Sequence, residues 1–206
     1  MNNLSRIQRS ELKACQSEPI INCRLTAAEL KARVGNPAGT DKADVTNPNY
    51  KGKVVYSNGK LQLNLSYVLT GNIVRAEIGL RHIREVYSAG GVIVNFKANP
   101  GKFDIRIHGA TLAEISLGLG LCNCEAGLYI GGWAPSPGHA MWGNALLLAS
   151  TPEKKTWKLT DAHEFGHKLG LKHRTDGGIM DYAFPDKPDP RRFTTSDLQR
   201  IIDLYR

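Results

Sequence analysis

From His163 to His173 the chain reads HEFGHKLGLKH, a run of eleven residues with three histidines, one glutamate and two glycines. On a helix, residues four apart lie above one another, so His163 and His167 can direct their imidazoles at one ion. Gly170 stands where the helix must end, because glycine tolerates the left-handed conformation that reverses the chain. The reversal would bring His173 back as a third ligand.

This spacing predicts a zinc site of the catalytic kind. Three neutral histidines leave the fourth tetrahedral position to water, whereas a structural zinc is closed by protein. Glu164 is rotated about 100° from His163 round the helix and can hold the bound water, so it is the candidate general base. A histidine pair at helical spacing is more often exposed at the surface without a function, or hydrogen-bonded in the core. The full set at fixed offsets, however, has a chance expectation on the order of 10⁻⁵. We therefore expect a Zn²⁺ cofactor on His163, His167 and His173.

A second motif extends the pattern. Gly178-Ile179-Met180-Asp181-Tyr182 follows the histidine run after a few residues, and together the two segments resemble the metzincin clan of zinc metallopeptidases. The resemblance makes Met180 the Met-turn residue, a platform beneath the zinc rather than a ligand. Tyr182 matches the tyrosine of astacin-like and serralysin-like Met-turns, which approaches the zinc and can stabilise an oxyanion. A core aromatic residue is an equal interpretation of Tyr182.

The end of the chain resembles matrixins within that clan. Residues 193–205 place Leu198, Ile201, Ile202 and Tyr205 at helical spacing, like the C-terminal helix of matrixins, and His-Glu-Phe-Gly-His is also similar to that family. Matrixins usually have a proline soon after the Met-turn methionine, where Asp181 and Tyr182 stand here. The subfamily therefore stays open.

The order of the remaining elements predicts an α+β fold. Residues 61–67 alternate as a half-buried strand, and residues 72–88 form a helix that Gly90-Gly91 ends. The buried face of that helix should hold Ile73, Ala76, Leu80, Ile83 and Tyr87. Strands are expected at 92–94, 103–107, 127–131 and 145–149. This is the metzincin-like zincin order: a twisted mixed sheet with a long first helix, a zinc-binding helix, a Met-turn and a C-terminal helix.

Two regions are expected along the chain. Residues 1–50 would be an N-terminal helical extension and linker, a pro-segment or docking segment, and residues 51–206 the metzincin-like catalytic domain. The extension should hold two short helices, and the Gly-, Pro- and Asn-rich run 36–53 is the expected linker. Within the catalytic domain, the resemblance suggests that an extended substrate pairs with an edge strand. Residues 127–132 are the candidate, with an ordinary hairpin strand as the alternative.

Composition narrows the class of partner. The net charge of +8 favours acidic partners, but no nucleic-acid module accompanies it, so a solvated basic surface is the preferred interpretation. No transmembrane run or signal peptide is apparent, and we expect a monomer that is secreted or delivered outside the producing cell. The four cysteines, Cys15, Cys23, Cys122 and Cys124, permit two disulfides of open connectivity.

Two classes of function remain from the sequence. The first is a zinc endopeptidase that acts on a protein or peptide substrate, with an inhibitor or immunity protein as a further candidate partner. The second is a zinc-containing basic binding protein or toxin or effector domain that acts mainly by holding a partner. Glu164 separates the two, because a structural zinc has no use for a base beside an open coordination position.

Overall fold

The computed structural model describes residues 43–111, 114–115, 132–134, 143–150, 157–181 and 189–206. The predicted helices within residues 1–36, the strand at 127–131, Tyr182 and all four cysteines lie outside these described residues. Among the described residues, no helix is both long enough and apolar enough to cross a membrane.

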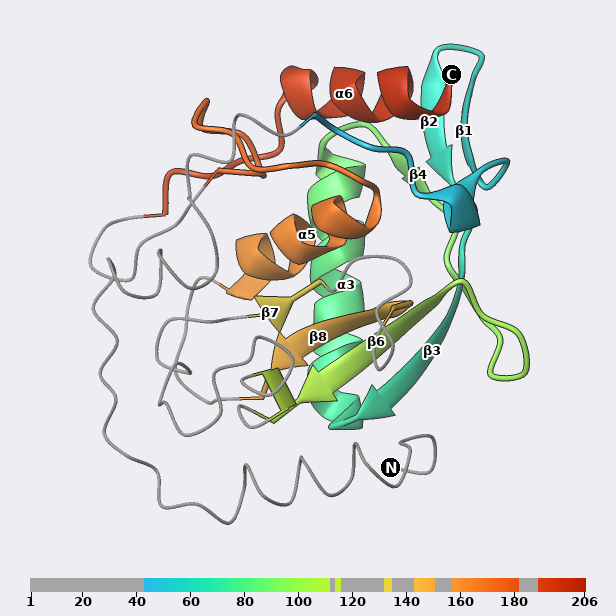
Figure 1. Ribbon diagram of the computed structural model, residues 1–206, viewed down its shortest axis with the longest axis vertical. Coiled ribbons are helices and arrows are strands. Elements are labelled where there is room, and N and C mark those ends of the chain that lie inside the picture. Colours follow the sequence, from blue (N-terminus) through green and yellow to red (C-terminus); the bar gives the residue numbers. More distant parts are fainter. Residues whose placement is uncertain (1–42, 112–113, 116–131, 135–142, 151–156, 182–188) are drawn as a thin grey trace.

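A mixed sheet of five strands forms the base of the fold (Figure 1). Its strands, in spatial order, are β5 (Lys97–Ala98), β3 (Ser66–Gly71), β6 (Ile105–Ala110), β8 (Ala145–Ala149) and β7 (Gly132–Trp133). The first four run parallel, and β7 pairs antiparallel with β8, Gly132 opposite Leu148. All five residues of β8 are buried, as a strand covered on both faces requires. The strand predicted at 145–149 is confirmed, and β7 forms an edge beside it.

A smaller sheet continues the first one. It consists of β1 (Val54–Ser57), β2 (Lys60–Leu63) and β4 (Ile93–Val94), with β1 antiparallel and β4 parallel to β2. The alternating run 61–67 therefore ends one strand and begins the next, with Asn64 and Leu65 between them. Figure 1 shows these strands at the upper right, beside the C-terminal helix.

Helix α3 (Ile73–Ala89) connects β3 to β4 and packs along the five-stranded sheet. The Asn72 side chain accepts a hydrogen bond from the Arg75 amide at its start, and Gly90 caps its end. Four of the five residues expected on the buried face are buried. Ile73, the first residue of the helix, is the exception, with 46% of its surface exposed.

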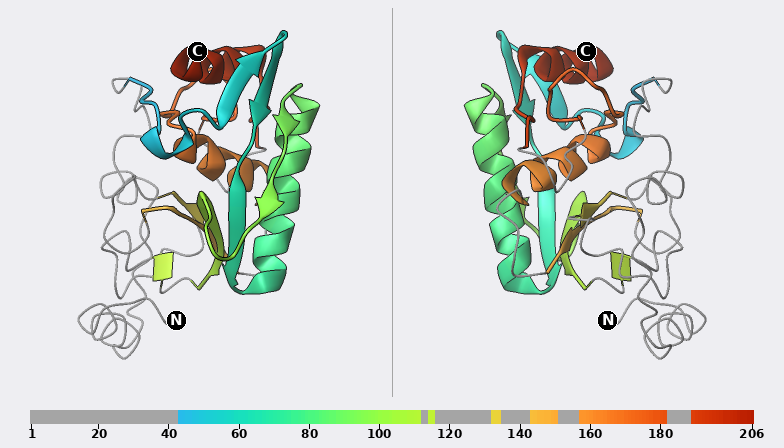
Figure 2. Two further views of the ribbon diagram at one scale, coloured as in Figure 1. Left: turned by 90° about the vertical axis from the view of Figure 1, so that its right-hand side faces the viewer. Right: turned by 90° about the vertical axis from the view of Figure 1, so that its left-hand side faces the viewer.

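Helix α5 (Trp157–Lys168) carries the histidine motif and crosses α3, as Figures 1 and 2 show. Phe165, Leu169 and Leu171 are fully buried in the common core, and Phe165 contacts the Tyr87 ring edge-on at 5.2 Å between centroids. The C-terminal helix α6 (Thr195–Tyr205) is confirmed, with Ile201 and Ile202 buried. The α+β architecture expected from the sequence is therefore present.

Residues 43–50 contact the packed core rather than standing apart from it. Pro48–Tyr50 forms a short 3₁₀ helix, η1, and the Tyr50 side chain is 1% exposed within the core. Asn47 is also buried and donates from its amide to the Lys168 carbonyl. Where the extension ends and the catalytic domain begins stays a prediction, but the packed region starts before residue 51.

Candidate metal centre and active site

The structure brings the three predicted histidines together. His163 and His167 lie on α5, and His173 follows the turn after that helix. The Nε2 atom of His173 lies 3.2 Å from Nε2 of His163 and 3.2 Å from Nε2 of His167. One ligand atom from each ring lies within 4.8 Å of the others. The site that the spacing predicts is therefore assembled.

The hydrogen bonds of the rings test whether this group suits a cation. Nδ1 of His163 lies 2.9 Å from the Ile179 carbonyl, and Nδ1 of His167 lies 2.9 Å from the Leu171 carbonyl. A carbonyl only accepts, so both Nδ1 atoms carry the proton, and in a neutral ring Nε2 is then a bare acceptor. Acceptor nitrogens that converge need a positive centre between them. A tetrahedral zinc places its histidine nitrogens about 3.3 Å apart, so the residues fit zinc.

The protonation of the rings agrees with a ligand role. Burial lowers the pKa of His163 well below its usual value, with the neighbouring histidines acting in the same direction. Burial likewise lowers the pKa of His167 to about 4 and that of His173 to about 3. All three imidazoles are neutral at pH 7, which is the form that binds metal.

Glu164 lies between the histidine centre and the edge of the sheet. Its backbone is next to His163 on α5, and its carboxylate accepts a hydrogen bond from the amide of Ala134, the residue after β7. Burial raises the pKa of Glu164 to about 7, against the opposing charge of Arg191. A carboxyl group whose pKa lies near neutral pH can both accept and donate a proton, which suits proton transfer.

The predicted Met-turn passes beneath α5. Met180 is fully buried, and a Cβ atom built on Gly166 would lie 2.4 Å from its sulfur. The neighbouring Ile179 donates its amide to Asp197 at 3.0 Å and accepts from His163 through its carbonyl. Asp197, on α6, also accepts from the Thr194 hydroxyl and so closes a capping box. His163 is thereby linked through a single residue, Ile179, to the C-terminal helix.

The turn at Gly170 has the conformation that the sequence predicted. Gly170 has φ +98°, and a Cβ atom there would lie 1.9 Å from the Val45 carbonyl oxygen. Only glycine fits both the backbone conformation and the approach of the neighbouring chain.

Several residues around the site were not predicted. Asp197 accepts a hydrogen bond from the Met-turn residue Ile179. The backbone of Ala134 bonds to Glu164, and Arg191 lies close enough to lower the pKa of Glu164. Arg191 pairs with Asp189 at 2.8 Å and donates to the Thr160 hydroxyl. The capping pattern Thr194-x-x-Asp197 was a readable signal for one of these contacts, whereas nothing local in the sequence indicates the others.

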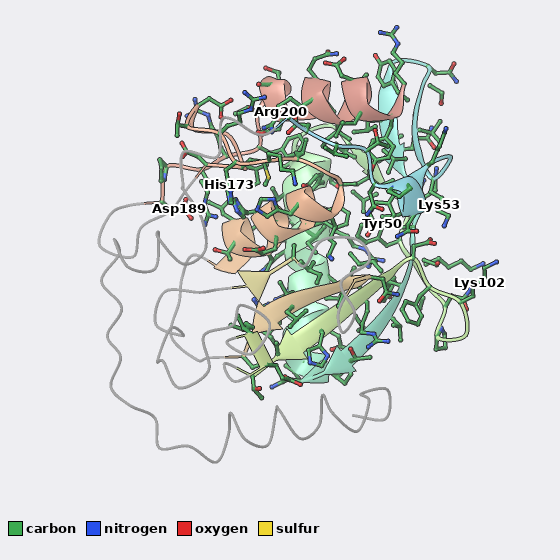
Figure 3. All side chains as sticks on the ribbon, in the orientation of Figure 1. Tyr50, Lys53, Lys102, His173, Asp189 and Arg200 are labelled. Carbon is green, nitrogen blue, oxygen red and sulfur yellow. The ribbon has the colours of Figure 1, made fainter. Side chains whose placement is uncertain are left out.

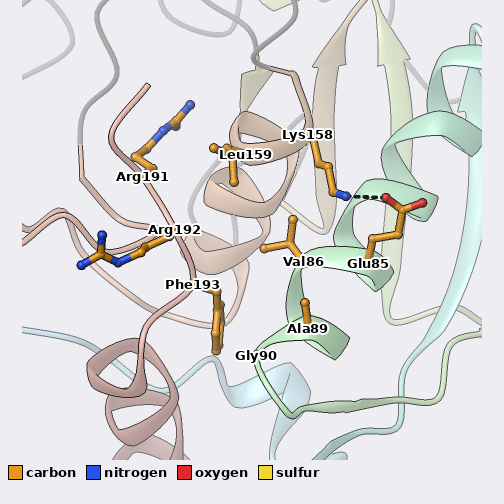
Figure 4. Close-up of a pocket in the computed structure, with 9 residues that line it drawn as sticks. All are labelled: Glu85, Val86, Ala89, Gly90, Lys158, Leu159, Arg191, Arg192 and Phe193. Carbon is orange, nitrogen blue, oxygen red and sulfur yellow. Dashed lines mark ion pairs between the residues drawn. The ribbon is translucent and has the colours of Figure 1, made fainter. Parts of the chain in front are cut away.

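The other described histidines, His82 and His108, lie in separate hydrogen-bond networks. His82 contacts Asp161, and His108 lies between Thr70 and Glu114. An open pocket of about 270 Å³ also lies apart from the three histidines (Figure 4). It is lined by the end of α3, the start of α5 and residues 191–193, with an ion pair of 2.6 Å between Lys158 and Glu85 at its side.

Comparison with known proteins gives the family. A family model described as matrixin matches residues 95–206, more than half of the chain. Matrix metalloproteinase-18 of Xenopus laevis is 36% identical over 80 residues, which are 34% of this chain and 16% of that protein. The matched segment is thus a small part of the relative, but the family match includes α5, the Met-turn segment and α6. The chain therefore belongs to the matrixin family, zinc metallopeptidases of the metzincin clan.

Proposed function

We propose that this chain is an endopeptidase that uses zinc and Glu164 to hydrolyse internal peptide bonds of protein substrates. The proposal depends on one observation: the Nε2 atoms of three imidazoles converge beside the Glu164 carboxyl group, whose pKa is raised to about 7. A site built only to stabilise the fold would have no use for that carboxyl group.

The chemistry divides between the metal and the protein. A zinc ion on three histidines lowers the pKa of a bound water to about 7 and polarises a carbonyl group. Glu164 accepts a proton from the attacking water and later delivers it to the leaving amine. The positive charge of the metal favours the carboxylate form of Glu164 and so prepares it as a base.

Two further residues have proposed supporting roles. Met180 serves as the platform beneath the metal, which its burial against Gly166 supports. Tyr182 helps to stabilise the oxyanion that forms on the substrate carbonyl. Its position two residues after Met180 in the sequence supports this role.

An extended substrate is proposed to lie along the edge strand β7. In the described part of the sheet, β7 is the terminal strand, and Glu164 reaches the residue that follows it. Main-chain pairing with such an edge would hold a peptide in the extended form. The expected pairing segment 127–132 overlaps the described strand at Gly132.

The setting in which the chain acts is proposed from the relative and the family. The name of the relative, matrix metalloproteinase, supports secretion or delivery outside the producing cell. We further propose that the chain works as a monomer, that residues 1–50 form a pro-segment or docking segment, and that an inhibitor or immunity protein controls it.

Cleavage of a denatured protein mixture tests the function. Cleavage should stop with a chelator and return with added zinc. Glu164→Gln should keep a full zinc content and lose nearly all activity, because the metal site is intact while proton transfer is lost. His167→Ala should lose the metal itself. Wild-type turnover by Glu164→Gln would refute the role of the base, and a full zinc content in His167→Ala would refute the ligand.

A further inference from the structure

The carbonyl groups at the end of α5 find their partners far away in the chain. The last carbonyls of a helix have no partner within the helix and must be satisfied from outside. The Lys168 carbonyl accepts from the Asn47 side chain at 2.8 Å, and the Gly170 carbonyl accepts from the Val45 amide at 3.0 Å. The Leu169 carbonyl accepts from the Tyr205 hydroxyl at 2.9 Å. Residues 44–47, here named the strap, and α6 thus close this end of the zinc helix.

The strap also reaches the residue before the third ligand. Asp44 Oδ1 accepts from the Lys172 amide at 2.9 Å, and Arg200 Nη2 donates to the Lys172 carbonyl at 2.8 Å. Asp44 and Arg200 in turn bind each other through two hydrogen bonds, of 2.7 and 2.8 Å. Both polar groups of the Lys172 backbone are therefore held by one ion pair.

This ion pair has the geometry to fix a backbone. Its two side chains are each 12% exposed, so water competes weakly for the bonds. A planar guanidinium that holds a carboxylate with two bonds gives a defined orientation as well as binding energy. Figure 3 shows Arg200 on α6 and His173 on the segment after α5, on the same side of the molecule. The peptide that leads into His173 is thus fixed from both sides.

We propose that Asp44 and Arg200 are positioning residues for the third zinc ligand, and that the strap holds the His173 imidazole in place for zinc. Neither residue belongs to the group of three histidines that would hold the metal. Their effect is on the time for which His173 stays in its binding position, because the Lys172 backbone would otherwise be free to exchange its bonds with water. The inference rests on zinc binding by the three histidines and is independent of whether the chain cleaves peptides.

The competing explanation is that the pair stabilises the fold as a whole. The chain offers a matched control for it in Asp104. That carboxylate is 14% exposed, accepts the Ser66 amide at 2.7 Å and pairs with Lys53. It thus makes the same kinds of contact as Asp44, at the start of β6 and apart from the histidines.

The test is the rate at which the zinc-loaded full chain releases metal to an excess of a coloured chelator. Asp44→Asn should release zinc about 10- to 100-fold faster than the wild type. Removal of groups that orient metal ligands lowers metal affinity by about this range, and we expect the loss to appear as faster release. Arg200→Lys, which keeps the charge but loses the fork, should shift the rate in the same direction. Asp104→Asn should stay within about twofold of the wild type, even where urea unfolding shows a comparable loss of stability without metal.

Three results would overturn the proposal. Zinc release from Asp44→Asn and Arg200→Lys could stay within twofold of the wild type. Asp104→Asn could accelerate release as much as Asp44→Asn does. Asp44→Asn and Arg200→Lys could also both fail to fold with zinc present, as seen by circular dichroism, while Asp104→Asn folds, which would assign the ion pair to global stability. If only Asp44→Asn fails to fold, the rate for Arg200→Lys decides.

Discussion

The zinc helix is held at its two ends by different chemistry. In its first half, Asp161 has no exposed surface and receives two bonds from Arg75, of 3.0 and 2.5 Å, and one contact of 2.8 Å from His82. Arg75 also donates to the Ala149 carbonyl at the end of β8. At the other end, neutral hydrogen bonds from the strap and Tyr205 close the helix. The ion pair between Asp44 and Arg200 lies beyond them, with 12% of each side chain exposed.

The difference indicates a division of labour along one helix. A buried charge network joins α5 to α3 and β8, so it governs how the large elements pack. Breaking half of such a network leaves an uncompensated charge in the core, which is costly, although the intact pair contributes little net stability. The contacts at the other end hold single peptide groups and govern where His173 lies. Changes at the first end should therefore cost global stability, and changes at the second end should cost zinc retention.

The largest expected effect comes from breaking the buried end. Asp161→Leu leaves the Arg75 guanidinium without its carboxylate and should lower the free energy of unfolding by about 3–5 kcal/mol. Urea unfolding of the zinc-free protein measures this loss. In the double variant Arg75→Met with Asp161→Leu, the stranded charge is removed and most of the loss should return. A single-variant loss below about 1 kcal/mol would show that the network is no stronger than a surface pair.

Gly170→Ala is the corresponding break at the other end. The substitution meets a φ of +98°, which costs about 1–3 kcal/mol, and a Cβ contact of 1.9 Å with the Val45 carbonyl. Gly177→Ala is the control, because Gly177 has φ +74° but nothing within 4 Å of its Cβ position. Gly170→Ala should lose more stability than the control and should also release zinc faster. If the two variants lost the same stability and released zinc at the same rate, the close approach of the Val45 carbonyl to Gly170 would have no effect on the turn.

The sequence predicted the local parts of this site and missed the distant ones. His163, His167 and Gly170 were readable because helical spacing and glycine conformation are properties of adjacent residues. The long helix followed from periodicity in the same way, whereas its cap at Asn72 became visible only in the structure. The fold class and zinc as the cofactor agree with the family match.

The contacts that hold the site depend on pairings across the chain. Asp44 meets Arg200 across 156 residues, and Arg75 meets Asp161 across 86. No periodicity links such positions, so these contacts cannot be predicted from a single sequence. The loop character expected of residues 36–53 also concealed that residues 44–47 serve the zinc helix. An acidic residue such as Asp161, two positions before a ligand on a buried helix, is the one local hint that a partner had to exist.

Tyr205→Phe gives a smaller and more local effect. The change removes the hydroxyl that donates to the Leu169 carbonyl at 2.9 Å and accepts from the backbone N–H of Asn47 at 3.2 Å. Leaving these groups without their partner should cost about 1 kcal/mol, measured by urea unfolding. Zinc release should rise less than in Asp44→Asn, because the Lys172 backbone keeps both of its bonds. A larger rise than in Asp44→Asn would place the control of His173 in the Tyr205 contact with the Leu169 carbonyl rather than in the Asp44–Arg200 pair.

The smallest effect concerns Glu164, which lies between the two ends, and it appears as a pH dependence. Its folded pKa is raised from 4.5 to about 7, mainly by burial. It therefore contributes stability below about pH 4.5 that is lost as the pH rises through 7. The histidines act in the opposite direction, because their lowered pKa values give stability above pH 6.5 that is lost on acidification toward pH 4.

The difference between Glu164→Gln and the wild type isolates the carboxyl group, since both proteins keep the histidines. Without zinc, the variant should gain stability relative to the wild type as the pH rises from 4.5 to 7, followed by thermal unfolding at each pH. The half-buried position of Glu164 lets water reduce the size of this gain, but not its sign. A difference that is flat or falls over this range would mean that the folded protein holds Glu164 as an ordinary ionised carboxylate even without metal. The energetic strain of the site would then lie in the histidines alone.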